Sequence, residues 1–314
     1  MFCTKHTSSY KSSDGIHDII YSVYQPLGAV RGVVQIAHGM CEYFGRYEDF
    51  AHFLVKHGYV VCGNDHLGHG RSVRESSELG YFAEENGWEC VVKDMHNLTR
   101  LMKKGYSDIP YFLFGHSMGS FMSRAYCTRY SRELDGAIFC GTSGEIKGIP
   151  ALLTIIDCFK KVYGSKHRSN KVNKIAFGAY NKQITDSDSS YAWLTRDKAV
   201  VEEYVNDDKC AYIFTLNGFE NLMKVLWYVS NDKWFETYNK SLPTLLIAGD
   251  ADPVGEYGKG VEEVYEKLCE NDCKVDMKLY HDARHEILNE LEKEKTYADV
   301  LEFLNECVSE YKKV

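Results

Sequence analysis

One stretch, Pro110 to Ser120, restricts the fold of this chain more than any other. It runs from an apolar segment at 111–114, through Gly-His-Ser-Met-Gly at 115–119, into helical spacing that ends at Tyr130. A strand, a sharp turn and a helix around G-x-S-x-G form a nucleophile elbow, whose serine has a strained backbone. Side chains at Gly115 and Gly119 would collide with neighbouring backbone in such a turn. The pattern predicts that Ser117 stands at a strand tip as a nucleophile.

Short apolar runs alternate with helical patterns on both sides of this motif. Strands are predicted at 33–37, 59–62, 136–140, 244–248 and 275–280, and helices at 47–57, 88–104, 261–268 and 296–311. This alternation predicts an α/β fold with a mostly parallel central sheet and helices on both faces. A further strand at 16–25 is expected to form an antiparallel hairpin with the run at 33–37, through a turn at 26–28.

The alternation lapses between residues 145 and 239, where helical segments such as 151–159 mix with polar and aromatic stretches. An insertion between parallel strands emerges at the carboxyl edge of the sheet, where open α/β sheets hold their sites. We therefore expect one core made of residues 1–144 and 240–314, with residues 145–239 inserted as a helical cap or lid over Ser117.

A serine nucleophile needs a histidine base and a carboxylate that orients it, and on this type of sheet they follow in the order Ser, acid, His. Two loops that follow predicted strands supply candidates. Asp252 is favoured over Asp250, because an aspartate beside the strand end more often satisfies the backbone donors of the turn. His285 is favoured over His281, because it lies further into its loop, where it can lean back to the serine.

The tetrahedral intermediate of acyl transfer needs two backbone N–H donors. One is expected from Met118, which follows the nucleophile, and the other from Met40, in the loop after the first parallel strand. Gly39 would let the backbone approach the substrate. Glu42 and Arg46 are spaced to form an ion pair that holds this loop, although an ordinary surface pair fits the spacing equally well.

His66, His69 and Arg71 lie on a glycine-rich loop with no partnering cysteine or acid set. Metal sites normally combine such histidines with further ligands at regular spacing. We therefore interpret these residues as stabilising the loop and expect no metal there.

Composition excludes some classes of function. The net charge of -8 favours neither nucleic-acid binding nor electrostatic docking on an anionic membrane. Eleven cysteines, an odd number without a disulfide-like spacing, are typical of reduced thiols in a cytoplasmic protein. No run of about 18 apolar residues and no leader-like segment at the start are visible. We expect a soluble intracellular protein.

Taken together, these blocks resemble the α/β-hydrolase superfamily, and most closely its monoacylglycerol lipase and lysophospholipase branch, often described as serine aminopeptidase-like. The resemblance rests on 38–47, on Asp-His-Leu-Gly-His-Gly-Arg-Ser at 65–72, on 115–119, on Gly249-x-x-Asp252 and on His285. It implies that Ser117, Asp252 and His285 form a catalytic triad, that Met40 and Met118 are the oxyanion donors, and that no cofactor or metal takes part. The resemblance weakens in the cap, residues 145–239, where individual residues are not matched to the lid of those lipases.

The sequence leaves several classes of substrate open. The sequence suggests an ester-binding pocket, for which the candidate residues are Gly39, His116, Ile149, Leu153, Tyr180 and Phe214. The same apolar cap residues would also suit packing on the core or transient contact with a lipid surface. The leading hypothesis is hydrolysis of monoacylglycerols, lysophospholipids or similar lipid esters. The alternatives are amide or aminopeptide cleavage by the same triad, which needs an acidic pocket, and a non-catalytic binding protein. Acyl length, head group and oligomeric state stay open.

Overall fold

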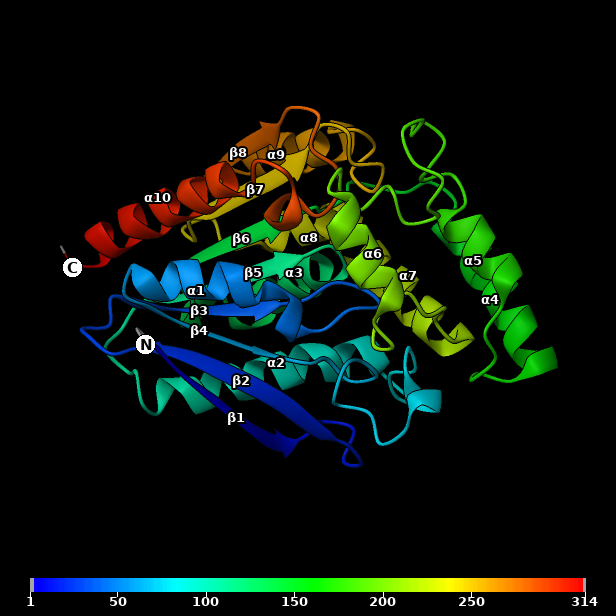
Figure 1. Cartoon of the computed structure of the whole chain (residues 1–314), viewed down its shortest axis with the longest axis horizontal. Helices are drawn as coiled ribbons and strands as arrows, with labels where there is room; N and C mark the ends of the chain where they lie inside the picture. Colours follow the sequence, from blue (N-terminus) through cyan, green and yellow to red (C-terminus); the bar gives the residue numbers. More distant parts are fainter. Residues whose placement is uncertain (1–2, 313–314) are drawn as a thin grey trace.

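The structure, a computed structural model, describes residues 3–312 and contains one sheet of eight strands (Figure 1). The strands are β1 (Cys3–Lys11), β2 (Asp18–Pro26), β3 (Gly32–Ala37), β4 (Tyr59–Asn64), β5 (Tyr111–His116), β6 (Gly136–Cys140), β7 (Thr244–Gly249) and β8 (Val275–Tyr280). Their spatial order is β1-β2-β4-β3-β5-β6-β7-β8. From β4 to β8 all neighbours pair in parallel, whereas β2 pairs antiparallel with β1 and β4. The predicted mostly parallel sheet is confirmed.

Helices cover both faces of the sheet, as predicted. On one face α1 (Glu48–Lys56) and α10 (Lys293–Tyr311) bury residues such as Phe50 and Leu304 against Ile36 and Phe114 of the central strands. On the other face lie α2 (Gly87–Lys103), α3 (Met118–Tyr130) and α9 (Lys259–Glu270). The amphipathic spacing of these helices accounts for this packing, because each presents one apolar stripe to the sheet. The central strands are thereby buried on both faces.

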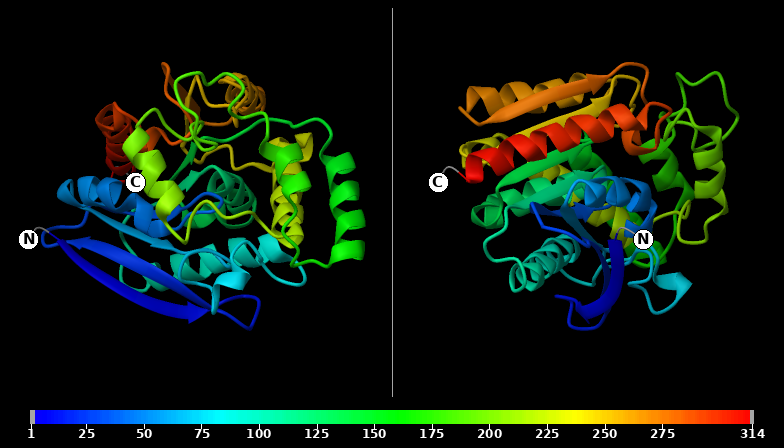
Figure 2. Two further views of the ribbon diagram at one scale, coloured as in Figure 1. Left: turned by 45° about the vertical axis from the view of Figure 1, so that its right-hand side comes forward. Right: turned by 60° about the vertical axis from the view of Figure 1, so that its left-hand side comes forward.

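Five helices lie between β6 and β7. These are α4 (Ile149–Tyr163), α5 (Asn170–Phe177), α6 (Lys198–Asn206), α7 (Leu216–Ser230) and α8 (Asp232–Thr237). Helix α7 packs against α2 and α3, and α4 packs on α7. Figures 1 and 2 show α4 and α5 at the outer end of the molecule, away from the sheet. No helix between residues 3 and 312 is both long and apolar enough to span a bilayer.

The expected hairpin between β2 and β3 was wrong. Strand β3 has β4 and β5 as its two neighbours, so no edge is left for β2, which pairs with β4 instead. The hairpin partner of β2 is β1, whose sequence, Cys-Thr-Lys-His-Thr-Ser-Ser-Tyr-Lys, is too polar to be recognised as a strand. Such polarity fits an edge strand, which needs no second hydrophobic face.

Candidate active site

Ser117 lies in the tight turn between β5 and α3. Its backbone has φ 53° and ψ -123°, outside the regions that non-glycine residues normally occupy. The flanking glycines are needed sterically: a Cβ at Gly115 would lie 2.4 Å from the carbonyl oxygen of Gly119, and one at Gly119 would lie 2.1 Å from that of Ala37. The strained turn is therefore possible only with glycine at both positions, and it projects the serine from the carboxyl end of the central strand.

His285 and Asp252 form a buried hydrogen-bonded pair at the same edge of the sheet. The Nδ1 atom of His285 lies 2.8 Å from Oδ2 of Asp252, and both residues are almost completely buried. The other carboxylate oxygen of Asp252 accepts a hydrogen bond from the backbone N–H of Val254. A carboxylate held in this way fixes the tautomer of the imidazole and leaves Nε2 free for a proton transfer.

The competing aspartate and histidine lie together in a different place. Asp250 accepts hydrogen bonds from His281, at 3.0 Å, and from the backbone N–H of Asp282. His281 and Asp282 are exposed and Asp250 is partly buried, and within residues 3–312 these three are the only set of His, Cys, Asp and Glu side chains close enough to share a metal ion. It does not line the cavity that contains Ser117 and His285.

The loop after β3 lies directly against the elbow. A Cβ at Gly39 would lie 3.2 Å from the Cβ of Ser117, so the two backbones approach closely there. The N–H of Gly39 donates to the carboxylate of Glu42 at 2.5 Å and is therefore occupied. Met40 is the next residue along this loop. Met118 begins α3, and the first N–H groups of a helix have no acceptor within the helix.

Glu42 and Arg46 form part of a buried network that also includes Glu286 and His116. Arg46 binds both oxygens of Glu286, at 2.6 and 2.7 Å, and the second oxygen of Glu42 at 2.8 Å. The hydroxyl of Tyr47 donates to Glu42. His116 connects the loop after β3 to the loop that contains His285: its Nδ1 lies 3.3 Å from Glu42, and its Nε2 lies 3.3 Å from the backbone oxygen of His285. Of the two readings of Glu42 and Arg46, the structure favours the loop-holding pair.

The charges in this network stabilise one another. Burial alone would raise the pKa of the Glu42 carboxyl, but the hydrogen bond from His116 and the charge of Arg46 hold it below its usual range. Burial would lower the pKa of His116, yet its hydrogen bond to Glu42 and the charge of Glu286 raise it. Since both ring nitrogens of His116 face oxygen acceptors, the protonated ring satisfies both. The four charged groups then sum to zero.

Three further histidines, His38, His66 and His69, are packed below this loop. The Nδ1 of His38 donates to the carbonyl oxygen of Gly39, and its Nε2 accepts from the backbone N–H of His66. Burial and the neighbouring His38 lower the pKa of His69 to about 3, and burial also lowers those of His38 and His66. These rings are therefore neutral, and they hold the 65–72 loop against the loop after β3.

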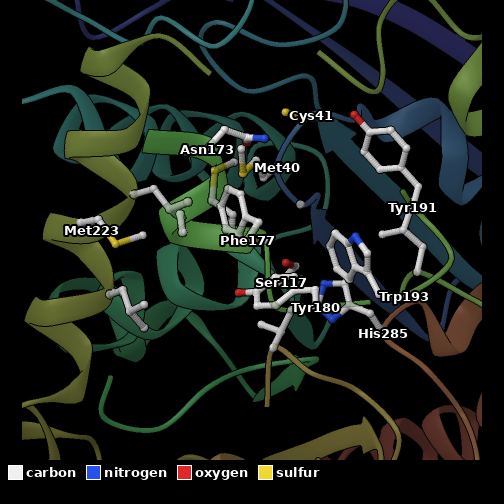
Figure 3. Close-up of a pocket in the computed structure, with 18 of the residues that line it drawn as sticks. Met40, Cys41, Ser117, Asn173, Phe177, Tyr180, Tyr191, Trp193, Met223 and His285 are labelled. Carbon is white, nitrogen blue, oxygen red and sulfur yellow. The ribbon is translucent and has the colours of Figure 1, made fainter. Parts of the chain in front are cut away.

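A cavity of about 540 Å³ opens above Ser117 and His285. Figure 3 shows Ser117, Tyr180, Trp193 and His285 around one end of it, and Met223 at the opposite side. Among the predicted substrate-binding residues, Gly39, His116, Ile149 and Tyr180 line this cavity. Its apolar wall comes from helices α3, α4, α5 and α7 through Phe121, Ile149, Leu152, Phe177, Leu222, Met223 and Leu226.

Two of the predicted substrate-binding residues lie elsewhere. Leu153 does not line the cavity, because its neighbour Leu152 faces it and successive helical side chains point about 100° apart. Phe214 is fully buried in the core, where its ring packs on His69 and Phe82. Their position outside the cavity has one cause in common: apolar character does not tell which cavity or core a side chain enters.

Trp193, an aromatic residue between β6 and β7, lies next to the histidine of the site. Its ring lies 5.1 Å from that of His285 and 5.0 Å from that of Tyr180. The backbones of the two residues are also hydrogen-bonded, since the carbonyl oxygen of Trp193 accepts from the N–H of His285 at 3.4 Å. The segment around Trp193 therefore covers the histidine. No local pattern in the sequence points to this contact.

Comparisons with known proteins show the family to which this chain belongs. A family model described as serine aminopeptidase, S33, matches residues 28–292. The chain is 26% identical over 304 residues to a monoacylglycerol lipase of Mycolicibacterium smegmatis, covering 96% of this chain and 97% of that protein. It is 25% identical over 276 residues to the monoglyceride lipase of Rattus norvegicus, covering 85% and 80%.

Solved structures share the whole fold. A thermostable carboxyl esterase from Bacillus coagulans, in complex with glycerol, superposes with a TM-score of 0.92 at 28% identity, over 97% of this chain and 99% of the esterase. A monoglyceride lipase from Saccharomyces cerevisiae superposes with a TM-score of 0.74 at 19% identity, over 98% of this chain and 96% of that one. Since the family model spans most of the chain, this protein belongs to the serine aminopeptidase S33 family, within the monoacylglycerol lipase-like branch of the α/β-hydrolases.

Proposed function

We propose that this protein is a serine hydrolase that cleaves carboxylic esters of lipid type, such as monoacylglycerols or lysophospholipids, through an acyl-enzyme. The observation that carries the proposal is the buried hydrogen bond between Asp252 and His285, because His285 lines the same cavity as Ser117. The names of the relatives, monoacylglycerol lipase and carboxyl esterase, support the same class of substrate.

In the proposed reaction Ser117 attacks the ester carbonyl while His285 takes the hydroxyl proton. Asp252 orients the ring and stabilises the imidazolium that forms. The proton then passes to the leaving alcohol, and an ester bond joins Ser117 to the acyl group. A water molecule, deprotonated by His285, releases the fatty acid and restores the serine.

The negative charge on the intermediate would be stabilised by the N–H groups of Met40 and Met118. The occupied N–H of Gly39 supports this assignment, because it leaves Met40 as the next donor along the loop. Loss of one such donor typically lowers turnover about 100- to 1000-fold. No metal or cofactor is needed for any step of this scheme.

The cavity favours an ester with an apolar acyl chain over a peptide. An aminopeptidase needs a free carboxylate to hold the substrate's ammonium group. Two acidic side chains line the cavity, Glu42 and Glu286, and both are bound to Arg46. Four further acidic residues between β6 and β7, Glu202, Glu203, Asp207 and Asp208, do not line it. Ester hydrolysis is therefore the better proposal.

The helices between β6 and β7 would determine the substrate. We propose that residues 145–239 act as the cap, since α4 and α5 provide one wall of the cavity and lie farthest from the sheet. Through its outer face this cap would make transient contact with a lipid surface, from which long-chain substrates are drawn.

The test is kcat/KM for p-nitrophenyl esters from acetyl to palmitoyl, with Ser117→Ala as the blank. We expect the value to rise with chain length beyond butyryl, since the cavity wall is largely apolar, and Ser117→Ala to lower it by several orders of magnitude. A maximum at acetyl would reject a lipid ester. Full activity in Ser117→Ala would reject the mechanism, and absence of all hydrolysis in the folded wild type would favour a binding protein.

A further inference from the structure

The charge of this protein is distributed very unevenly. Residues 145–182, which contain α4 and α5, hold eight Lys and Arg residues and only two acidic ones, a net charge of +6. Because the whole chain carries -8, the remainder carries -14. The net charge of the whole chain therefore hides a strongly basic segment, and this segment forms the outer end of the molecule (Figure 2).

Most of the basic side chains in this segment are available to a partner. Six lysines are exposed, namely Lys147, Lys161, Lys166, Lys171, Lys174 and Lys182. Lys161 pairs with Asp157 at 2.7 Å. In residues 3–312 no acidic group pairs with Lys147, Lys171, Lys174 or Lys182. The other two cations are engaged, since Lys160 binds Glu220 and Arg168 binds backbone carbonyls.

Exposed apolar side chains accompany the lysines. On α4, Ala151, Ile155, Cys158 and Val162 are all exposed and follow the spacing i, i+4, i+7 and i+11, so they form one outward stripe. Val162 is 72% exposed, and on α5 Ile175 is 58% exposed. A soluble surface rarely repeats apolar residues along one helix face without a partner. Helices with such a stripe beside lysines are typical of membrane interfaces.

The cavity opens on this same surface. Lys147, Lys174, Ile175 and Gly178 are exposed and also line the cavity above Ser117. A substrate that enters there would pass between two lysines and an exposed isoleucine. The entrance, the basic side chains and the apolar stripe therefore lie on the same outer surface of the molecule, formed by α4, α5 and the residues that flank them.

We infer that this face docks on an anionic lipid bilayer and places the cavity entrance against it. Lysine side chains would lie at the level of the acidic headgroups, while the stripe of α4 enters the interface. The rest of the molecule has a net charge of -14 and would be repelled by the same membrane surface. Attraction at one end and repulsion elsewhere would orient the protein on the bilayer. This inference rests on the proposed function for the identity of the substrate, but the docking itself does not require hydrolysis.

The test measures sedimentation of the full chain with two kinds of sucrose-loaded vesicle, pure phosphatidylcholine and phosphatidylcholine with 30 mol% phosphatidylserine. Binding to the anionic vesicles should be at least tenfold stronger at 50 mM NaCl and should be largely lost at 500 mM, because surface charges are then screened. The variant Lys161→Gln/Lys171→Gln/Lys182→Gln should weaken it about tenfold or more. None of these three lysines lines the cavity, so hydrolysis of soluble p-nitrophenyl butyrate should stay unchanged.

The matched control is Lys104→Gln/Lys240→Gln/Lys274→Gln. These three exposed lysines precede β5, β7 and β8, at the opposite edge of the sheet, and the variant has the same net charge. It should bind anionic vesicles as the wild type does. A second variant, Ile155→Ser/Val162→Ser, tests the apolar stripe and should weaken binding to anionic vesicles even at 50 mM NaCl.

Three outcomes would overturn the inference: equal binding to both vesicles, equal loss in the control variant, or no binding. A fourth outcome would also overturn it: the variant Lys161→Gln/Lys171→Gln/Lys182→Gln binds anionic vesicles as the wild type does but has a raised KM for a monomeric anionic lysolipid. The lysines would then recognise the headgroup of a substrate and not a membrane. Ser117→Ala separates this inference from the proposed function: it should lose hydrolysis and keep vesicle binding.

Discussion

Arg46 holds both oxygens of Glu286, at 2.6 and 2.7 Å, across a sequence separation of 240 residues. Glu286 follows the histidine of the candidate triad, and Arg46 also binds Glu42 in the loop that would supply an oxyanion donor. The ion pair therefore joins two loops that must keep a fixed relation to Ser117. All three side chains are largely buried, so this ion pair is more than a surface contact.

The substitution Arg46→Met should lower the free energy of unfolding of this protein and reduce its activity. The change removes the cation that binds Glu286 and one of the two that neighbour Glu42, and breaking a buried pair typically costs about 3–5 kcal/mol. Urea titration measures the free energy of unfolding. A lower kcat, measured at urea concentrations below the unfolding transition, would indicate that the two loops are displaced. The control is Arg74→Met, because Arg74 pairs with Glu78 but its side chain is 63% exposed. Equal stability of the wild type and Arg46→Met would show that the pair contributes nothing.

Gly119→Ala should abolish most of the activity through sterics alone. A Cβ there would lie 2.1 Å from the carbonyl oxygen of Ala37 and 2.5 Å from that of His38, and both are backbone atoms that cannot move aside. The loop after β3 would be displaced from the elbow, so we expect kcat/KM to fall by at least about 100-fold. Gly28→Ala is the matched control, since nothing lies within 4 Å of its added Cβ. An active Gly119→Ala enzyme would contradict the assigned geometry.

The features predicted from the sequence depend on local patterns. Buried parallel strands are continuous apolar runs, so β3 to β7 were recognised, and the G-x-S-x-G turn requires its glycines whatever surrounds it. The pairing of His285 with Asp252 followed from two loops that leave the same edge of a parallel sheet. In these cases the topology of the parallel sheet determines where in space a short sequence motif lies.

The features that escaped prediction depend on contacts between distant segments. Strand β1 is polar and has no local hydrophobic signal. Whether Leu152 or Leu153 faces the cavity depends on the rotation of α4, which packing against α7 determines. The pairing of Arg46 with Glu286 likewise has no local signature. The basic segment was overlooked for a simpler reason, since the net charge of the whole chain averages over it.

The unfolding free energy should fall as the pH drops below about 6.5, partly because of His69. Its pKa in the folded state is about 3, below the value of about 6.5 expected for the unfolded chain. Between these values the unfolded state binds a proton that the folded state does not, so the stability present above pH 6.5 is lost toward pH 3. His69→Phe removes this proton, and the slope of unfolding free energy against pH, measured by urea titrations from pH 4 to 6, should decrease by about 1.4 kcal/mol per pH unit. An unchanged slope would mean that His69 is protonated in the folded state.

Leu152→Trp should shorten the acyl chain that the enzyme accepts. Leu152 contributes to the apolar wall of the cavity together with Met223 and Leu226 of α7, and the larger ring would fill part of the cavity. We expect kcat/KM for p-nitrophenyl palmitate to fall more than tenfold while that for the acetate ester changes less than threefold, because the reacting groups at Ser117 are not touched. The matched control is Ile155→Trp, one turn further along the same helix, where the side chain is exposed and outside the cavity. If both variants lowered palmitate hydrolysis alike, the acyl chain would not lie along this wall. If Leu152→Trp lowered the rates for all chain lengths equally, the substitution would have disturbed the catalytic residues themselves, and the acyl chain would have to be placed toward α5 and Phe177 instead.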